Sequence, residues 1–172
     1  MITVQHNKRS AKWGLSYACF SEDHQYRYRL FRLWDSALPV IAFCMLNPST
    51  ADESVNDPTI ERCERRARGW GYGALVVVNL FGFRSTDPAA LYAQVDPVGP
   101  ENIDSIVWAV RNSAMFICGW GTHGAHCGMG PMILQRLRDF YPGRAHALKV
   151  NRDGSPAHPL YLPYHLQPER MR

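Results

Sequence analysis

The sequence predicts an α/β protein: a three-layer α/β/α fold with a mainly parallel four-stranded sheet and an N-terminal antiparallel hairpin. Two observations lead to this fold class. Short apolar runs alternate with three amphipathic segments at residues 57–70, 103–110 and 131–140. The runs also lack the polar alternation of a sheet with one solvated face. Buried strands that alternate with helices are typical of parallel sheets joined by right-handed crossovers.

The hairpin is predicted at residues 15–20 and 26–34, where aromatic and aliphatic side chains flank a polar turn at residues 21–24. The core strands are predicted at residues 40–46, 74–80, 114–118 and 145–150. Asp57 followed by Pro58 predicts a helix start, because Asp caps helices and Pro fits the first helical position. The Asp-Pro pairs later in the chain are expected to lie in a loop after the second core strand.

The chain length of 172 residues suits one domain, with a hairpin extension at residues 1–38 and an α/β/α core at residues 39–172. No apolar run reaches the roughly 18 residues that cross a bilayer, and the first residues lack the layout of a signal peptide. We therefore expect a soluble, cytoplasmic protein. The five cysteines are scattered without a Cys-x-x-Cys pair, which argues against a disulfide framework and an iron–sulfur cluster.

Four turn-like segments, each placed after an apolar run, carry the candidate chemistry. They are residues 46–50, 79–84, 119–123 and 158–161. Open α/β sheets bind ligands at the carboxyl ends of parallel strands, so these segments are expected to form one site. Arg84 directly follows a strand end, and we interpret it as a phosphate contact assisted by Ser49, Thr50 and Ser85.

The polar turns also carry a family resemblance. The motifs are Leu46-Asn47-Pro48-Ser49-Thr50-Ala51-Asp52, Asp57-Pro58-Thr59, Asn79-Leu80-Phe81, Arg84-Ser85-Thr86-Asp87-Pro88, Gly99-Pro100-Glu101-Asn102, Trp120-Gly121 and His158-Pro159-Leu160-Tyr161-Leu162. Together they resemble the bacterial and phage family catalogued as domain of unknown function 1643. The resemblance covers about two thirds of the chain and names no activity.

The layout is also similar to the uracil-DNA glycosylase superfamily. Those enzymes have a parallel four-stranded α/β/α core, a water-positioning Asp or Asn after the first strand, and a His-Pro-Ser-like motif after the last. Asn47 with its Pro matches the first motif, His158 with its Pro matches the second, and Asn79 resembles the strand-end Asn that reads the base edge. The departures from the pattern are Met45, Ser49 and Leu160. They leave the identity of the base open.

This second resemblance implies hydrolysis of an N-glycosidic bond, with Asn47 and His158 as the catalytic residues. Asn47 is expected to orient water, His158 to donate to the base carbonyl, and Asn79 to bond the pairing edge of the base. The predicted substrate-binding residues are Leu46, Pro48, Ser49, Thr50, Asn79, Phe81, Arg84, Gly119, His123, Leu160 and Tyr161.

The expected function is therefore that of a uracil-DNA glycosylase-like protein that binds a nucleobase in nucleic acid or a nucleotide and hydrolyses its N-glycosidic bond. Two alternatives stay open: a hydrolase of free nucleosides or nucleotides, and a non-catalytic reader of modified bases. The expected partner is nucleic acid, with DNA favoured, or a nucleotide, and neither a membrane nor a cofactor is expected. The donors in residues 122–127 are not spaced as a closed zinc site, so no metal is expected. The arginines of the first helix are expected to form a solvated face: Arg62, Arg65, Arg66 and Arg68.

Overall fold

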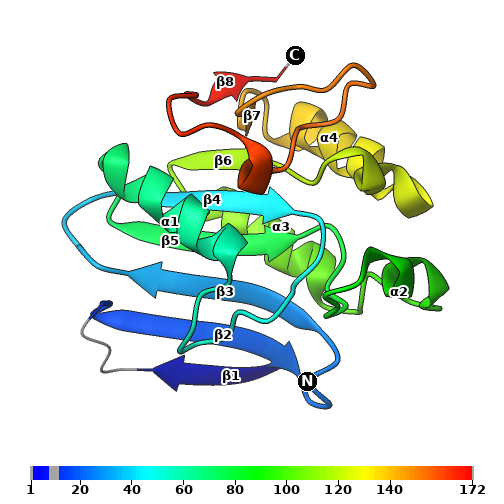
Figure 1. Cartoon of the computed structure of the whole chain (residues 1–172), viewed down its shortest axis with the longest axis horizontal. Helices are drawn as coiled ribbons and strands as arrows, with labels where there is room; N and C mark the ends of the chain where they lie inside the picture. Colours follow the sequence, from blue (N-terminus) through cyan, green and yellow to red (C-terminus); the bar gives the residue numbers. More distant parts are fainter. Residues whose placement is uncertain (1, 8–11, 172) are drawn as a thin grey trace.

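Eight strands form one sheet in the computed structural model, which describes residues 2–7 and 12–171 (Figure 1). The order across the sheet is β1-β2-β3-β5-β4-β6-β7-β8. The strands are β1 (Ile2–Asn7), β2 (Leu15–Ser21), β3 (Arg27–Leu33), β4 (Val40–Met45), β5 (Ala74–Asn79), β6 (Met115–Cys118), β7 (Ala145–Ala147) and β8 (Glu169–Arg170). The strands β1 and β8 therefore form the two outer edges.

The fold is α/β as predicted, but the prediction of a mainly parallel four-stranded sheet is wrong. Three strand pairings, β4 with β5, β4 with β6 and β6 with β7, are parallel. The other four pairings between the described strands are antiparallel. The reason is that the predicted hairpin, β2 and β3, does not stand apart: β3 pairs with the free edge of β5 and satisfies its backbone groups. A short strand, β8, extends the sheet at β7.

The division into an extension at residues 1–38 and a core at residues 39–172 stays a prediction. Residues 1, 8–11 and 172 of that division lie outside the described residues. None of the helices in the described ranges combines the length and the apolar character needed to cross a bilayer.

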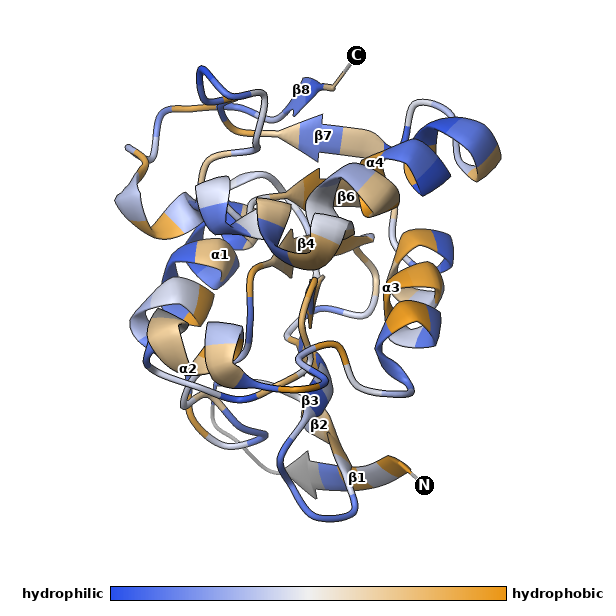
Figure 2. Ribbon diagram, turned by 90° about the vertical axis from the view of Figure 1, so that its right-hand side faces the viewer, coloured by the Kyte–Doolittle hydropathy of each residue, from blue (hydrophilic) through white to orange (hydrophobic). Residues whose placement is uncertain are grey.

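Four α-helices in the described part of the chain cover the two faces of the sheet. They are α1 (Pro58–Gly69), α2 (Pro88–Ala93), α3 (Asn102–Arg111) and α4 (Met129–Phe140). On one face Ile60 of α1 belongs to the same buried cluster as Phe43. On the other face Ile106 of α3 and Ile133 of α4 are buried in a cluster with Val76. Figure 2 looks along the sheet and shows α1 and α3 on opposite sides of it.

Two of the helices begin at an Asp-Pro pair. A carboxylate oxygen of Asp57 accepts from Thr59 N and Ile60 N, each at 2.9 Å, which confirms the predicted helix start. Asp87 likewise accepts from Ala89 N at 2.8 Å and starts α2, in a segment that was predicted as loop. The helix has only six residues, which is too few for an amphipathic period to reveal it.

The carboxyl ends of β4, β5, β6 and β7 lie along one edge of the sheet, because these strands are parallel. Pairing continues a little beyond the strands: Leu80 N donates to Met45 O at 2.8 Å and Phe81 N donates to Leu46 O at 3.0 Å. The segments that follow β4 and β5 therefore begin side by side at this edge of the sheet.

Candidate functional site

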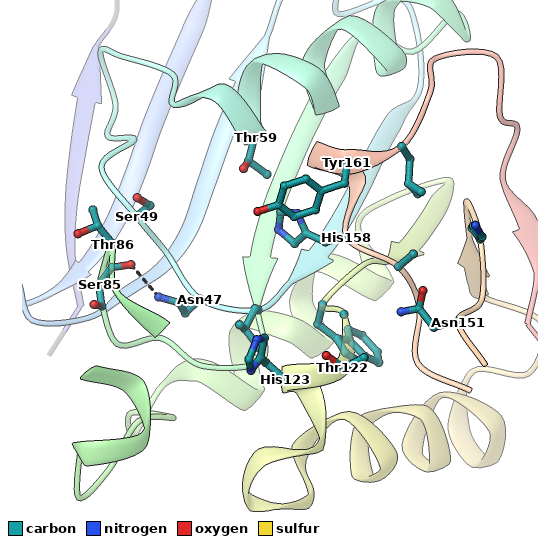
Figure 3. A pocket seen from close by; sticks show the side chains of 16 residues that line it. Asn47, Ser49, Thr59, Ser85, Thr86, Thr122, His123, Asn151, His158 and Tyr161 are labelled. Atoms are coloured by element: carbon teal, nitrogen blue, oxygen red, sulfur yellow. Dashed lines mark hydrogen bonds between the residues drawn. The ribbon is translucent and has the colours of Figure 1, made fainter. Parts of the chain in front are cut away.

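A cavity of about 550 Å³ lies at the carboxyl edge of the parallel strands (Figure 3). Its wall comes from the segments after β4, β5, β6 and β7, from the first turn of α1, and from the one-turn helix η2 (Pro159–Tyr161). The lining residues are Leu46, Asn47, Ser49, Thr59, Ser85, Thr86, Trp120, Gly121, Thr122, His123, Lys149, Asn151, Ala157, His158, Tyr161 and Leu162. A volume of this size is typical of pockets for small ligands.

The structure brings together some of the predicted site residues and separates others. Those that line the cavity are Leu46, Asn47, Ser49, His123, His158 and Tyr161. Thr50 and Arg84 line a neighbouring cavity instead. Asn79 and Phe81 are buried, at 1% and 0% exposure, and line neither cavity. The residues that also line neither cavity are Pro48, Gly119 and Leu160.

The Asn47 side chain is held by two backbone carbonyls. Its Nδ2 donates to Ser85 O at 2.9 Å and to Pro48 O at 3.2 Å. Both partners are acceptors, so Nδ2 must face them and Oδ1 is the atom left for a ligand or a water. Ser85 N also donates to Pro48 O at 2.9 Å, which joins the loop after β4 to the loop after β5. A donor bound to Oδ1 would therefore have a fixed position.

His158 is a neutral hydrogen-bond donor at neutral pH. Leu160 N donates to Nδ1 at 3.4 Å, so the proton of the neutral ring lies on Nε2. Burial lowers the pKa of His158 to about 4, and the nearby carboxylate of Asp57 offsets only part of this effect. The ring therefore carries an uncharged Nε2–H group, and it lines the cavity with Tyr161 beside it (Figure 3).

Two glycines allow the wall to pack closely. A Cβ on Gly119 would lie 2.9 Å from Pro159 Cδ, so only glycine lets the residue after His158 rest against the end of β6. A Cβ on Gly124 would lie 2.0 Å from the ring of Trp120, which is 2% exposed. Gly119 thus allows the cavity wall to pack closely, although it does not itself line the cavity.

Aromatic side chains pack behind His123, outside the cavity lining. His123 Nδ1 lies 2.7 Å from Tyr92 Oη, and the ring of Tyr92 is 4.5 Å from that of His126. His126 in turn lies 5.5 Å from buried Phe81. Among the described residues, no group of three or more His, Cys, Asp or Glu side chains could hold a metal ion.

The lining carries no carboxylate, because none of its members is Asp or Glu. Lys149 supplies a cation. The members that the sequence analysis did not single out as ligand contacts include Thr59, Thr86, Thr122, Lys149 and Asn151. Asn151 directly follows the last predicted strand, so the strand-end rule that selected Asn47 also applied to it.

The segment after His158 is clamped by α1. Arg66, which is 2% exposed, donates through Nη2 to Leu162 O at 2.7 Å and to Pro163 O at 3.2 Å. Arg62 Nη2 also donates to Leu162 O, at 2.6 Å. The expectation of a solvated arginine face is therefore wrong for Arg66, because the backbone carbonyls of residues 162 and 163 accept its donors.

Comparison with known proteins gives one match. The model of a family described as "Protein of unknown function (DUF1643)" matches residues 27–160. The match begins at the start of β3, ends within η2, and includes every cavity-lining residue except Tyr161 and Leu162. No curated protein and no solved structure matches the chain at a significant level.

Proposed function

The chain belongs to the DUF1643 family, and we propose that it is a uracil-DNA glycosylase-like protein that binds a nucleobase, in nucleic acid or in a nucleotide, and hydrolyses its N-glycosidic bond. One observation carries the proposal. Asn47 and His158, more than a hundred positions apart in the sequence, line the same cavity, one with a free amide oxygen and the other with a neutral Nε2–H donor.

In this reaction the bond between the sugar C1′ and the base nitrogen breaks, and its electron pair leaves with the base. His158 Nε2–H donates to a base carbonyl oxygen, where the negative charge accumulates. Asn47 Oδ1 accepts a hydrogen bond from the water that adds to C1′. The proton of that water goes to the departing base or to solvent, because an amide does not take a proton at neutral pH. Catalysis therefore relies on orientation and electrostatics, and we expect it to be slow.

The strand order supports this proposal. The four parallel strands follow the order β5-β4-β6-β7, with Asn47 two residues after the first of them in the chain and His158 after the last. The water-positioning residue and the His-Pro motif occupy the corresponding places in the uracil-DNA glycosylase superfamily. The α-helices on both faces agree with the α/β/α layers of that superfamily.

A non-catalytic reader of modified bases is the second candidate, and one observation favours it. The cavity lining contains no carboxylate, so it lacks an Asp or Glu side chain that would act as a general base toward the attacking water. A reader needs only the donors and acceptors that are present. Base release separates the two candidates, because a reader binds the base and leaves the glycosidic bond intact.

The test is a search for abasic sites in labelled single-stranded and double-stranded oligonucleotides that carry uracil, hypoxanthine or modified pyrimidines. We expect wild type to release one of these bases, and His158→Ala or Asn47→Ala to be slower by about a hundredfold. His165→Ala is the matched control, because His165 is exposed and lines neither cavity. Binding without release supports the reader, and equal cleavage by wild type and Asn47→Ala rules out the proposed mechanism.

A further inference from the structure

His123 lies in the wall of the cavity that holds Asn47 and His158. Figure 3 looks into this cavity with Tyr161 and His158 above and with Asn47 and His123 below. The side chain of His123 is exposed, so solvent also reaches its ring. The ring therefore borders the space in which the proposed reaction takes place and stays in contact with bulk water.

The proposed reaction needs an acceptor for the proton of the attacking water. His158 does not supply it, because Nδ1 accepts from Leu160 N and Nε2 carries the proton of the neutral ring. The side chain of Lys149 has donors only, and the hydroxyl and amide groups of the lining take no proton at neutral pH. An imidazole is the side-chain type that takes up a proton most readily near neutral pH, and His123 is the imidazole of the lining that remains.

Tyr92 of α2 contacts one nitrogen of the His123 ring and leaves the other one unpaired. Tyr92 Oη lies 2.7 Å from His123 Nδ1, and the two rings meet edge-on, with 6.0 Å between their centroids. His123 Nε2 has no hydrogen-bond partner among the residues that the structure describes. Tyr92 is 48% exposed, so water can accept the phenol proton while Oη accepts from Nδ1–H. With its proton on Nδ1, the neutral ring keeps its lone pair on Nε2.

A short segment that begins at Ser85 and ends at Tyr92 connects His123 with Asn47. The carbonyl oxygen of Ser85 accepts from Asn47 Nδ2 at 2.9 Å. Ser85 also fixes the start of α2, because its Oγ donates to Asp87 O at 2.8 Å and accepts from Asp87 N at 3.0 Å. The same segment therefore holds the amide of Asn47 at one end and the ring of His123 at the other, which fixes the two side chains relative to each other.

We propose that His123 is the general base of the proposed reaction and that Tyr92 is its positioning residue; the inference rests on the proposed function. The attacking water donates one hydrogen bond to Asn47 Oδ1 and the other to His123 Nε2, which leaves an oxygen lone pair for the sugar C1′. This lone pair forms the new bond to C1′, while the bond from C1′ to the base nitrogen breaks and its electron pair leaves with the base. The water proton passes to His123 Nε2, the imidazolium releases it to solvent, and the base anion takes a proton from solvent.

The first experiment measures release of the base at saturating oligonucleotide. His123→Ala should lower kcat about a hundredfold and leave KM nearly unchanged, and added imidazole should raise its rate about tenfold because it supplies the missing acceptor. Tyr92→Phe, which loses only the hydroxyl group, should lower kcat about tenfold. The matched controls are His165→Ala and Tyr164→Phe, at exposed positions outside both cavities.

The second experiment identifies the tautomer of His123 without any substrate. In protein whose histidines carry ¹⁵N, long-range ¹H–¹⁵N spectra assign the proton of each neutral ring to Nδ1 or to Nε2, and His123→Ala identifies the signals of that ring. We expect Nδ1–H for His123 in wild type and Nε2–H for His158, which serves as the internal reference. Tyr92→Phe should shift His123 toward Nε2–H, whereas Tyr164→Phe should leave it unchanged.

The outcomes separate this inference from the proposed function. If His123→Ala releases the base as fast as wild type while Asn47→Ala is slow, His123 is not the general base and the proposed function stands. A slow His123→Ala that imidazole does not rescue, or an Nε2–H tautomer of His123 in wild type, also overturns the inference. If wild type releases no base from any oligonucleotide, the proposed function fails, and the role of His123 in it fails as well.

Discussion

The surroundings of residue 47 favour an amide over a carboxylate. Asn47 Nδ2 donates to two carbonyl oxygens, and an Asp carboxylate would point an acceptor at both of them. We expect Asn47→Asp to lower the free energy of unfolding by about 1–3 kcal/mol and not to raise activity. Urea unfolding and the base-release assay measure the two effects, with Asn47→Ala as the variant that loses the bonds without the repulsion. An Asp variant that is both stable and faster would contradict this account.

His158 makes stability depend on pH. Its pKa is about 4 in the folded protein and about 6.5 in an unfolded chain, so the unfolded chain binds the proton first as the pH falls. The stability that comes from the neutral ring is complete above about pH 6.5 and is lost as the pH falls through about 4, by up to about 1.4 kcal/mol per pH unit. Urea unfolding across this range should show a shallower dependence for His158→Asn than for wild type. His165→Asn should behave as wild type, and a wild-type profile for His158→Asn would refute the prediction.

That Asn47 and His158 line one cavity was predictable from sequence, because both residues follow buried segments at the same edge of a parallel sheet. The burial of Asn79 was not predictable from sequence, because it depends on which face of β5 the side chain lies on and on what packs against that face. Its Nδ2 and Oδ1 are buried without partners, so the structure leaves its role in base reading as a prediction. Lys149 was not predicted as a site residue, because residues 145–150 were interpreted as a strand, whereas β7 ends at Ala147.

At the scale of elements, α1 fixes the segment that carries His158. Arg66 bonds Leu162 O and Pro163 O from inside the protein, and Arg66→Met would leave these carbonyls without its donors. We expect a loss of about 2 kcal/mol in the free energy of unfolding. We also expect faster hydrogen exchange at the amides of Leu160 and Leu162. Arg65→Met is the matched control, because Arg65 is exposed on the same helix, and equal effects of the two variants would argue against a clamp.

The bounds of the strands that are buried on both faces could be predicted from the sequence. The strands β4 and β5 end within one residue of the predicted bounds, because apolar runs buried on both faces have sharp polar limits. The place of the hairpin in the sheet was not predictable, since β3 pairs with β5 across 40 intervening residues and no local pattern encodes that partner. The same holds for β8, which is two residues long and exposed.

At the scale of the whole molecule, the N-terminal strands support the loop that follows Asn47. Arg27 Nη1 donates to Ala51 O at 2.6 Å, and Arg32 donates to Asp52 O, to Val55 O and to the Asn56 side chain. Burial lowers the pKa of both guanidiniums to about 10, yet both stay charged at neutral pH. The loop carbonyls thus accept hydrogen bonds from two buried cations, and the antiparallel half of the sheet contributes to the geometry of the site.

The segment predicted as an extension is therefore expected to be required for folding. Removing residues 1–38 deletes β2 and β3, takes away the donors to the loop at residues 51–56, and exposes the edge of β5 with its apolar side chains. We expect residues 39–172 alone to aggregate or to lack a cooperative unfolding transition, measured by size-exclusion chromatography and thermal circular dichroism. Arg32→Gln in the full chain separates the two causes: it keeps the strand pairing, so it should fold, with a free energy of unfolding lower by about 2 kcal/mol. A monomeric 39–172 fragment with a cooperative transition would show that the parallel strands and their helices fold without the antiparallel ones.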